Sequence, residues 1–231
     1  MNPSTTAFCI VYASTLFLSF FIVIPSGLNL TDFNKKCVLF ATGEWNETTS
    51  GDHDLNISSW GKSSDCNFIM FMGIVCLFTS SLLLWKSVVF VCKGFEGSPF
   101  YSFISMIGCA LITFCLFVCS FIMSLGYSAW CDLILSKPDN DKVCWKTDLG
   151  NFDDKYNVDS ASFSSHLEIA EFGLWGSSLG WLVATSFSIA KVRYYHKNEE
   201  LLQSLAFEKD TLIPHRLRYR RIGEEDFDSI S

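Results

Sequence analysis

Four apolar segments separated by polar ones set the pattern of this chain. Residues 7–24 and 68–85 carry no Asp, Glu, Lys or Arg, and a third charge-free stretch of 35 residues covers 97–131. A fourth apolar segment covers 172–190. The hydrocarbon layer of a bilayer is about 30 Å thick and takes roughly 20 helical residues to cross. The pattern therefore predicts four membrane-spanning helices over residues 7–26, 67–91, 100–126 and 168–190.

This arrangement predicts an all-α membrane protein: an antiparallel bundle of four transmembrane helices with two short outer loops, 27–66 and 127–167, and a tail over 191–231. Pro25 and Gly27 are expected to end the first span, because proline interrupts a helix. The first segment could instead be a cleaved signal peptide. However, no Lys or Arg precedes it, and its apolar run exceeds the roughly 7–15 residues of a signal core. We expect the segment to be retained.

Two signals predict the same orientation. Basic residues follow the second and fourth spans, as is typical of cytosolic helix ends: Lys86, Lys93, Lys191, Arg193 and Lys197. The loop 27–66 contains three N-x-S/T sequons, at Asn29, Asn46 and Asn56, and N-glycosylation is a modification of secreted, surface-exposed segments. We expect a glycoprotein with both termini cytosolic, in the secretory and endosomal system or the plasma membrane. Asn29 lies close to the membrane.

Four of the ten cysteines lie in the outer loops: Cys37 and Cys66 in the first, Cys131 and Cys144 in the second. An even number in an oxidising compartment predicts disulfides. We favour Cys37–Cys66 and Cys131–Cys144, each within its own loop, while a bridge between the loops stays open. The disulfides are expected to stabilise loops too small to build a core of their own. Cys92, beside Lys93, is a candidate for S-palmitoylation.

No motif for catalysis or cofactor binding occurs, so we expect no enzymatic activity, no cofactor and no metal. The tail balances eight basic against eight acidic residues, which argues against nucleic acid as a partner. Glu168 and Glu171, with His166 nearby, stand at the outer mouth of the fourth span. They could hold a cation or gate a pore, but we expect them to cap the helix N-terminus.

The spans also carry packing signals. Small residues recur every four positions in the fourth span and form a stripe: Gly176, Gly180, Ala184 and Ser188. Such a stripe lets another helix approach closely, either within the bundle or in a partner protein or second copy. Aromatic residues near the predicted interfaces have the pattern of an anchoring belt: Trp60, Trp85, Tyr127, Trp130, Trp175, Tyr194 and Tyr195.

The tail combines a predicted helix over 198–212, ended by Pro214, with disordered residues after it. Two short patterns are similar to sorting signals read by clathrin adaptors. One is an acidic dileucine arrangement of Glu208, Leu212 and Ile213, and the other is Tyr219 with Ile222. Both require an exposed, extended chain whose apolar side chains enter pockets of the adaptor.

Several groups of residues resemble the transmembrane protein 179 family of four-span proteins, in the same order along nearly the whole chain. They are the segments 37–40, 43–45, 92–97, 130–132, 172–175, 200–202, 204–205 and 208–209. The resemblance implies a multi-pass membrane protein and supplies no catalytic residues. Claudins fit less well, because they are expected to have a closer cysteine pair in the first loop than Cys37 and Cys66.

These observations predict a non-enzymatic accessory or organising membrane protein. Its partners would be the lipid bilayer and another membrane protein or a second copy, with clathrin adaptors reading the tail. The alternative is a subunit of a channel or transporter with Glu168, Glu171 and His166 at its outer vestibule. A third reading is an adhesive protein that acts through the loop 27–66.

Overall fold

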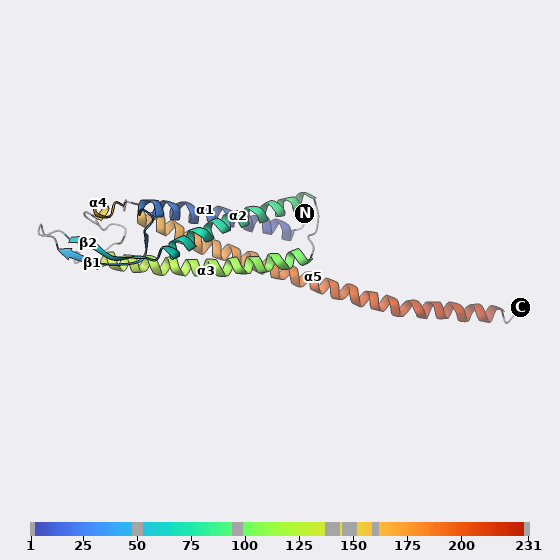
Figure 1. The fold of residues 1–231 in the computed structure, drawn as a ribbon. Helices are drawn as coiled ribbons and strands as arrows, with labels where there is room; N and C mark the ends of the chain where they lie inside the picture. Colours follow the sequence, from blue (N-terminus) through green and yellow to red (C-terminus); the bar gives the residue numbers. More distant parts are fainter. Residues whose placement is uncertain are drawn as a thin grey trace.

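The computed structural model describes residues 3–47, 53–93, 99–136, 144, 152–158 and 162–228, and from residue 210 onward the backbone alone. The elements are α1 (Pro3–Asp32), β1 (Cys37–Glu47), β2 (His53–Gly61), α2 (Ser63–Lys93), α3 (Pro99–Leu135), α4 (Phe152–Tyr156) and α5 (Phe163–Asp228). α1, α2, α3 and the first part of α5 form a bundle (Figure 1). We call the end with β1, β2 and α4 the hairpin end. The opposite end, where α5 leaves the bundle, is the tail end.

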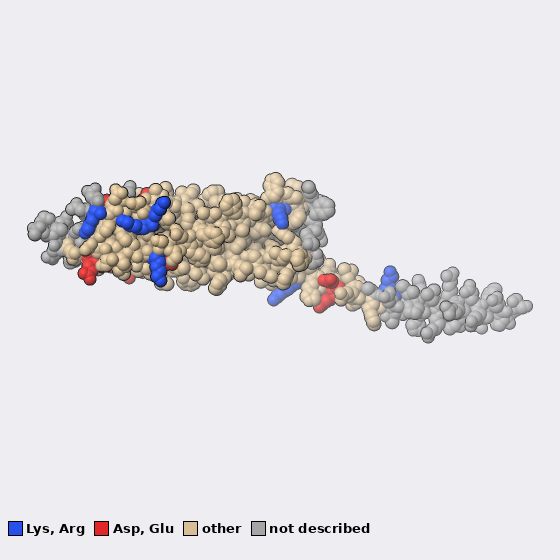
Figure 2. Space-filling view, viewed as in Figure 1, with Lys and Arg blue, Asp and Glu red and all other residues tan. Residues whose placement is uncertain are grey.

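Three described helices are long and apolar enough to cross a membrane: Thr6–Asp32, Ser63–Cys92 and Phe100–Leu135. The corresponding part of α5 contains more Gly and Ser, but it packs along both α1 and α3 and completes the bundle. The predicted all-α fold with four helices is therefore confirmed. Figure 2 shows charged side chains gathered toward the two ends, with an uncharged belt between them. Such a belt is what the hydrocarbon layer requires.

α1 is longer than predicted. It continues through Pro25 to Asp32, so the expected end of the span at Pro25 is wrong. Tertiary packing explains the continuation, because Ser26 and Asn29 are 7% and 8% exposed in the turns that follow the proline. A Cβ on Gly27 would lie 3.2 Å from the Cε of Met70 in α2. Close contact with α2 thus favours helix where proline alone disfavours it.

The true end of α1 is a local motif. Asn34 adopts φ of 49° and Lys35 adopts φ of 62°, in the left-handed region that asparagine tolerates well. The amide of Lys35 donates to the carbonyl of Leu30 at 2.7 Å, and that of Asn34 donates to Thr31 at 3.0 Å. This pair of bonds is a Schellman cap, which satisfies the last carbonyls of the helix. The chain then turns directly into β1.

The first loop contains an antiparallel β-hairpin that the sequence analysis did not predict. β1 pairs with β2 in a register that places Gly43 opposite Ile57, Glu44 opposite Asn56 and Trp45 opposite Leu55, with irregular pairing before Gly43. Phe40, with φ of 62°, lies in that irregular part. A Cβ on Gly61 would lie 1.7 Å from the carbonyl oxygen of Leu39. Glycine is therefore required where the end of β2 crosses β1.

α5 also differs from expectation at both ends. It begins at Phe163, earlier than the predicted 168, and its backbone remains helical through Pro214 to Asp228, where a helix end and disorder were predicted. Good helix formers such as Leu212, Arg216 and Leu217 lie on either side of Pro214, and they favour continued helix although proline removes one backbone hydrogen bond and crowds the preceding turn. The helix projects far beyond the bundle at the tail end (Figure 1).

Candidate functional site

An aromatic cluster fills the hairpin end of the bundle. Phe33, in the turn that follows α1, lies with its ring 6.5 Å from that of Trp130 in α3 and 6.1 Å from that of Phe163 in α5. Phe152 in α4 lies 6.3 Å from both Trp130 and Trp60 of β2. Phe33, Trp130 and Phe152 are completely buried. The prediction that these loops build no core is therefore wrong, and Trp60 and Trp130 belong to this core, not to a membrane-anchoring belt.

Two disulfides fasten this core to the bundle, and both favoured pairings are confirmed. Cys37, at the start of β1, is bonded to Cys66 in the first turn of α2, with the Cα atoms 5.8 Å apart. Cys131, near the end of α3, is bonded to Cys144, with the Cα atoms 5.3 Å apart. The Cys37–Cys66 disulfide links the start of the hairpin to the N-terminal turn of α2. We call the hairpin, α4 and the aromatic cluster the hairpin unit.

Hydrogen bonds fix the hairpin on both sides. The indole Nε1 of Trp45 donates to the carbonyl of Leu133 in α3 at 3.1 Å. On the edge of β2, the backbone amide of Ile57 donates to the hydroxyl of Tyr156 at 2.8 Å, and this hydroxyl donates to Asn56 Oδ1 at 3.1 Å. α4 thereby covers the strand edge, which would otherwise offer unpaired backbone groups to another chain.

One face of the hairpin is polar and exposed. Thr42, Glu44, Asn46, Asn56 and Ser59 are exposed on it, whereas Leu55 on the opposite face is completely buried. Two of the three candidate glycosylation sites, Asn46 and Asn56, therefore lie at the surface. The third, Asn29, is 8% exposed within α1, where its side chain packs inside the bundle.

The acidic residues of α5 tie helices together. Glu171 accepts a hydrogen bond from Ser124 in α3, and the same Ser124 oxygen accepts one from Trp175 Nε1 at 3.1 Å. Glu168 accepts from the hydroxyl of Tyr127 in α3 at 3.1 Å. The expected capping role is wrong, because α5 begins at Phe163 and both residues lie beyond its first turn.

His166 of α5 contacts α1. Its Nδ1 lies 3.4 Å from Oδ2 of Asp32, the last residue of α1. Among the residues the structure describes, no three His, Cys, Asp or Glu side chains are grouped so that they could hold a metal ion. The side chains of Glu168, Glu171 and His166, near the N-terminus of α5, thus make contacts between α5 and the helices α1 and α3.

The small-residue stripe of α5 packs against α1 inside the bundle. A Cβ on Gly176 would lie 3.2 Å from Leu18, and a Cβ on Gly180 would lie 2.6 Å from Thr15 Cγ2. Ala184 and Ser188 continue the stripe and are 0% and 5% exposed. Of the two interpretations that the sequence left open, packing within the bundle is correct, and the stripe offers no face to a partner.

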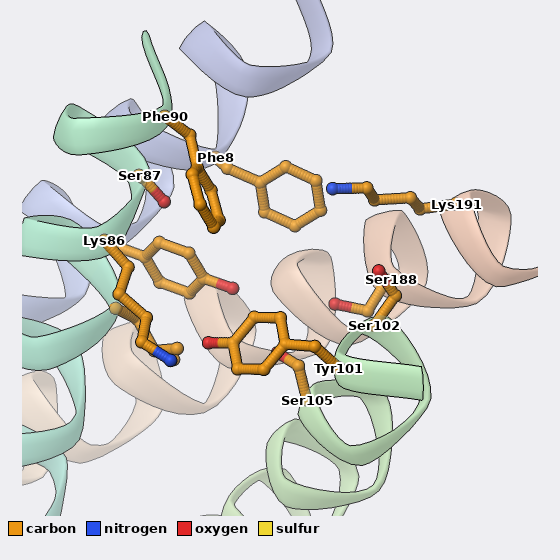
Figure 3. Close-up of a pocket in the computed structure, with 11 residues that line it drawn as sticks. Phe8, Lys86, Ser87, Phe90, Tyr101, Ser102, Ser105, Ser188 and Lys191 are labelled. Carbon is orange, nitrogen blue, oxygen red and sulfur yellow. The ribbon is translucent and has the colours of Figure 1, made fainter. Parts of the chain in front are cut away.

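A cavity of about 60 Å³ with a mixed polar and apolar lining lies at the tail end of the bundle, and sequence reasoning missed it. All four long helices line it, including Tyr12 of α1, Lys86 of α2, Tyr101 of α3 and Lys191 of α5. Figure 3 shows Lys86 reaching toward Tyr101, with Ser102, Ser105 and Ser188 beside them. The distance from Lys86 Nζ to the centre of the Tyr101 ring is 3.9 Å. The available signal was Lys86, a lysine within the predicted span 67–91, which the sequence analysis used only to predict orientation.

The remaining candidate residues lie at or beyond the tail end. Cys92 is exposed near the end of α2, as a palmitoylation site requires. Glu208 is exposed on the projecting part of α5, together with Leu201, Leu202 and Leu205. The side chains of Leu212, Ile213, Tyr219 and Ile222 lie outside the described residues. Their backbone is helical, so the extended conformation expected of the sorting signals is not found.

This architecture defines a multi-pass integral membrane protein with a disulfide-bonded hairpin between its first two membrane helices. A family model described as the transmembrane protein 179/179B claudin domain matches residues 5–213. The chain therefore belongs to the transmembrane protein 179/179B claudin-domain family, as the resemblance implied. No solved structure matches the chain.

The family match corrects one inference, because the cysteine spacing was taken to argue against claudins. Cys37 begins β1, whereas Cys66 lies in α2, beyond the end of β2. The spacing between the two cysteines thus spans the whole hairpin. It reflects where the bridge is attached, and it does not distinguish this chain from a claudin domain.

Proposed function

We propose that this protein is a non-enzymatic accessory or organising component of the plasma membrane or of secretory and endosomal membranes. In this proposal both termini are cytosolic and the hairpin unit is outside or luminal. The basic residues at the tail end and the exposed sequons Asn46 and Asn56 at the opposite end support this orientation.

The observation that carries the proposal is the fixed polar face of the hairpin. Thr42, Glu44 and Ser59 are exposed on a hairpin whose other face is fastened by Cys37–Cys66 and by the Trp45–Leu133 hydrogen bond. A preorganised surface loses little conformational entropy when a partner binds. We infer that this face contacts another membrane protein or a second copy of this chain, and that glycans on the hairpin limit where contact occurs.

The alternative of a channel or transporter subunit has less support. Glu168, Glu171 and His166 each contact a group on another helix of the same chain. Side chains with such contacts hold helices together, whereas an ion pathway needs polar side chains that face a water-filled cavity. The proposal that clathrin adaptors bind Leu212 and Ile213 requires local unwinding of α5, which the neighbouring Pro214 would assist.

A photo-crosslinking residue at Glu44, on the exposed face, tests the proposal in intact cells. The matched control places the same residue at Leu182, which is 42% exposed on a membrane helix. We expect Glu44 to give a discrete adduct that Cys37→Ser/Cys66→Ser abolishes, and Leu182 to give none. Purified protein that conducts ions in liposomes, with conduction lost in Glu171→Gln, would contradict the proposal and support the channel alternative.

A further inference from the structure

We propose that the cavity at the tail end binds the phosphate of an anionic lipid headgroup from the adjacent leaflet. Its volume of about 60 Å³ exceeds the roughly 10–15 Å³ that one water molecule needs, so it has room for a group larger than a single water. The site is independent of the proposed role of the hairpin face.

The chemistry of the lining selects an anion. Lys86 and Lys191 supply positive charge from α2 and α5, and the described lining contains no Asp or Glu. Neither lysine forms an ion pair with a described carboxylate. A lysine within a membrane helix is costly unless it has a partner, and phosphate oxygens accept the charge-assisted hydrogen bonds that an ammonium group donates.

Buried hydroxyl groups complete the site. Ser87, Ser102 and Ser188, from α2, α3 and α5, are 8%, 6% and 5% exposed, and each lines the cavity. The ammonium of Lys86 is held over the Tyr101 ring at 3.9 Å, which orients it while leaving N–H groups able to donate elsewhere. Donors from three helices therefore line one cavity, together with the rings of Phe8 and Phe90 (Figure 3).

The surroundings favour a lipid over a soluble phosphate. Trp85 and Phe100, next in sequence to Lys86 and Tyr101, are 71% and 72% exposed on the apolar outer surface. An acyl chain attached to a bound headgroup would lie against these rings. Basic pockets between transmembrane helices are a recurrent way of holding anionic headgroups.

Quenching of Trp85 by lipids with brominated acyl chains tests the proposal on the full chain in nanodiscs. Brominated phosphatidylglycerol is compared with brominated phosphatidylcholine, and Trp85→Phe identifies the part of the signal that comes from Trp85. We expect phosphatidylglycerol to reach half-maximal quenching at a lower mole fraction. Lys86→Gln should reduce that preference about five-fold, while Lys86→Arg retains it.

Two further variants separate binding from misfolding. Tyr101→Phe keeps the ring under Lys86 and should reduce the preference less than Lys86→Gln does, and Lys62→Gln, at the hairpin end, should leave it unchanged. Equal quenching by the two lipids in the wild type would contradict the proposed site. A preference for phosphatidylglycerol that is unchanged in Lys86→Gln/Lys191→Gln would also contradict it. Lysine-dependent thermal stabilisation by inorganic phosphate, with no lipid preference, would overturn the lipid assignment in favour of soluble phosphate.

Discussion

The two ends of the bundle differ in how their elements are held together. At the hairpin end, two disulfides, a buried aromatic cluster and hydrogen bonds between elements far apart in sequence hold β1, β2 and α4 in place. At the tail end, two lysines line a cavity, and α5 leaves the bundle with Leu201, Leu202 and Leu205 exposed.

This difference indicates a division of roles. A region held by disulfides and by contacts between distant segments can present a fixed surface, whereas lysines without a described carboxylate partner and exposed leucines gain free energy from a ligand or partner. In the proposed function the hairpin end acts as a rigid display surface. We expect binding of lipid or protein at the tail end to change the stability of the chain most.

Removing the bridge at the base of the hairpin should have the largest effect. We expect Cys37→Ser/Cys66→Ser to lower the free energy of unfolding by about 2–5 kcal/mol, because the bridge restricts the unfolded chain and ties β1 to α2. Thermal unfolding of the purified protein measures this change. Cys92→Ser, which removes an exposed free cysteine, is the control, and equal melting temperatures for the two variants would contradict the role of the bridge.

A bulky side chain at the α1–α5 contact should have the next largest effect. A Cβ at Gly180 meets Thr15 at 2.6 Å, whereas a Cβ at Gly108 meets nothing within 4 Å. We expect Gly180→Leu to destabilise the bundle by about 1–3 kcal/mol through overpacking, and Gly108→Leu to have little effect. Melting temperatures in the same detergent test this. The same loss in both variants would show that the contact is not specific.

The hydrogen-bonded chain of Trp175, Ser124 and Glu171 should contribute less. Glu171→Gln keeps the shape of the side chain but removes the charge, so we expect a loss of about 1 kcal/mol, in the range of a single hydrogen bond. Chemical denaturation measures the loss, with Glu199→Gln on the exposed part of α5 as the control. A gain in stability would show that the charge of Glu171 destabilises the folded chain. That result would favour a role in ion passage.

Glycosylation should affect stability least and report orientation directly. Asn46→Gln and Asn56→Gln are each expected to remove one glycosidase-sensitive mobility shift, because both residues are exposed on the hairpin. Asn29→Gln should remove none, because Asn29 is 8% exposed inside α1. Absence of any glycan on wild type expressed in mammalian cells would remove one of the two supports for the proposed orientation.

The sequence predicted the parts of the fold that are encoded locally. Charge-free runs located the membrane helices, and cysteines paired within each loop gave both disulfides. The hairpin had a weak local signal, since Leu55 and Ile57 alternate with polar Asn56 and Ser58, but the sequence analysis predicted no strand in this loop.

What sequence reasoning missed depends on contacts between distant segments. Phe33 from the turn after α1, Trp130 from α3 and Phe163 from α5 meet only after folding, so nothing near any one of them indicates a shared core. Likewise α1 passes Pro25 because α2 packs beside it. The cavity unites residues from four helices, and although Lys86, Ser188 and Lys191 stood out in the sequence, they did so for other reasons.

Hydrogen exchange of the full chain in nanodiscs tests the contrast between the two ends most directly. Local opening sets the exchange rate of each amide, so slow exchange reports stable structure. The account predicts that the paired amides of residues 43–47 and 53–57 exchange slowly, and that residues 195–209, on the projecting part of α5, exchange at least a hundred-fold faster, on the order of 3 kcal/mol less protection. A hairpin that exchanges as fast as the projecting helix would contradict the rigid display surface on which the proposed function depends.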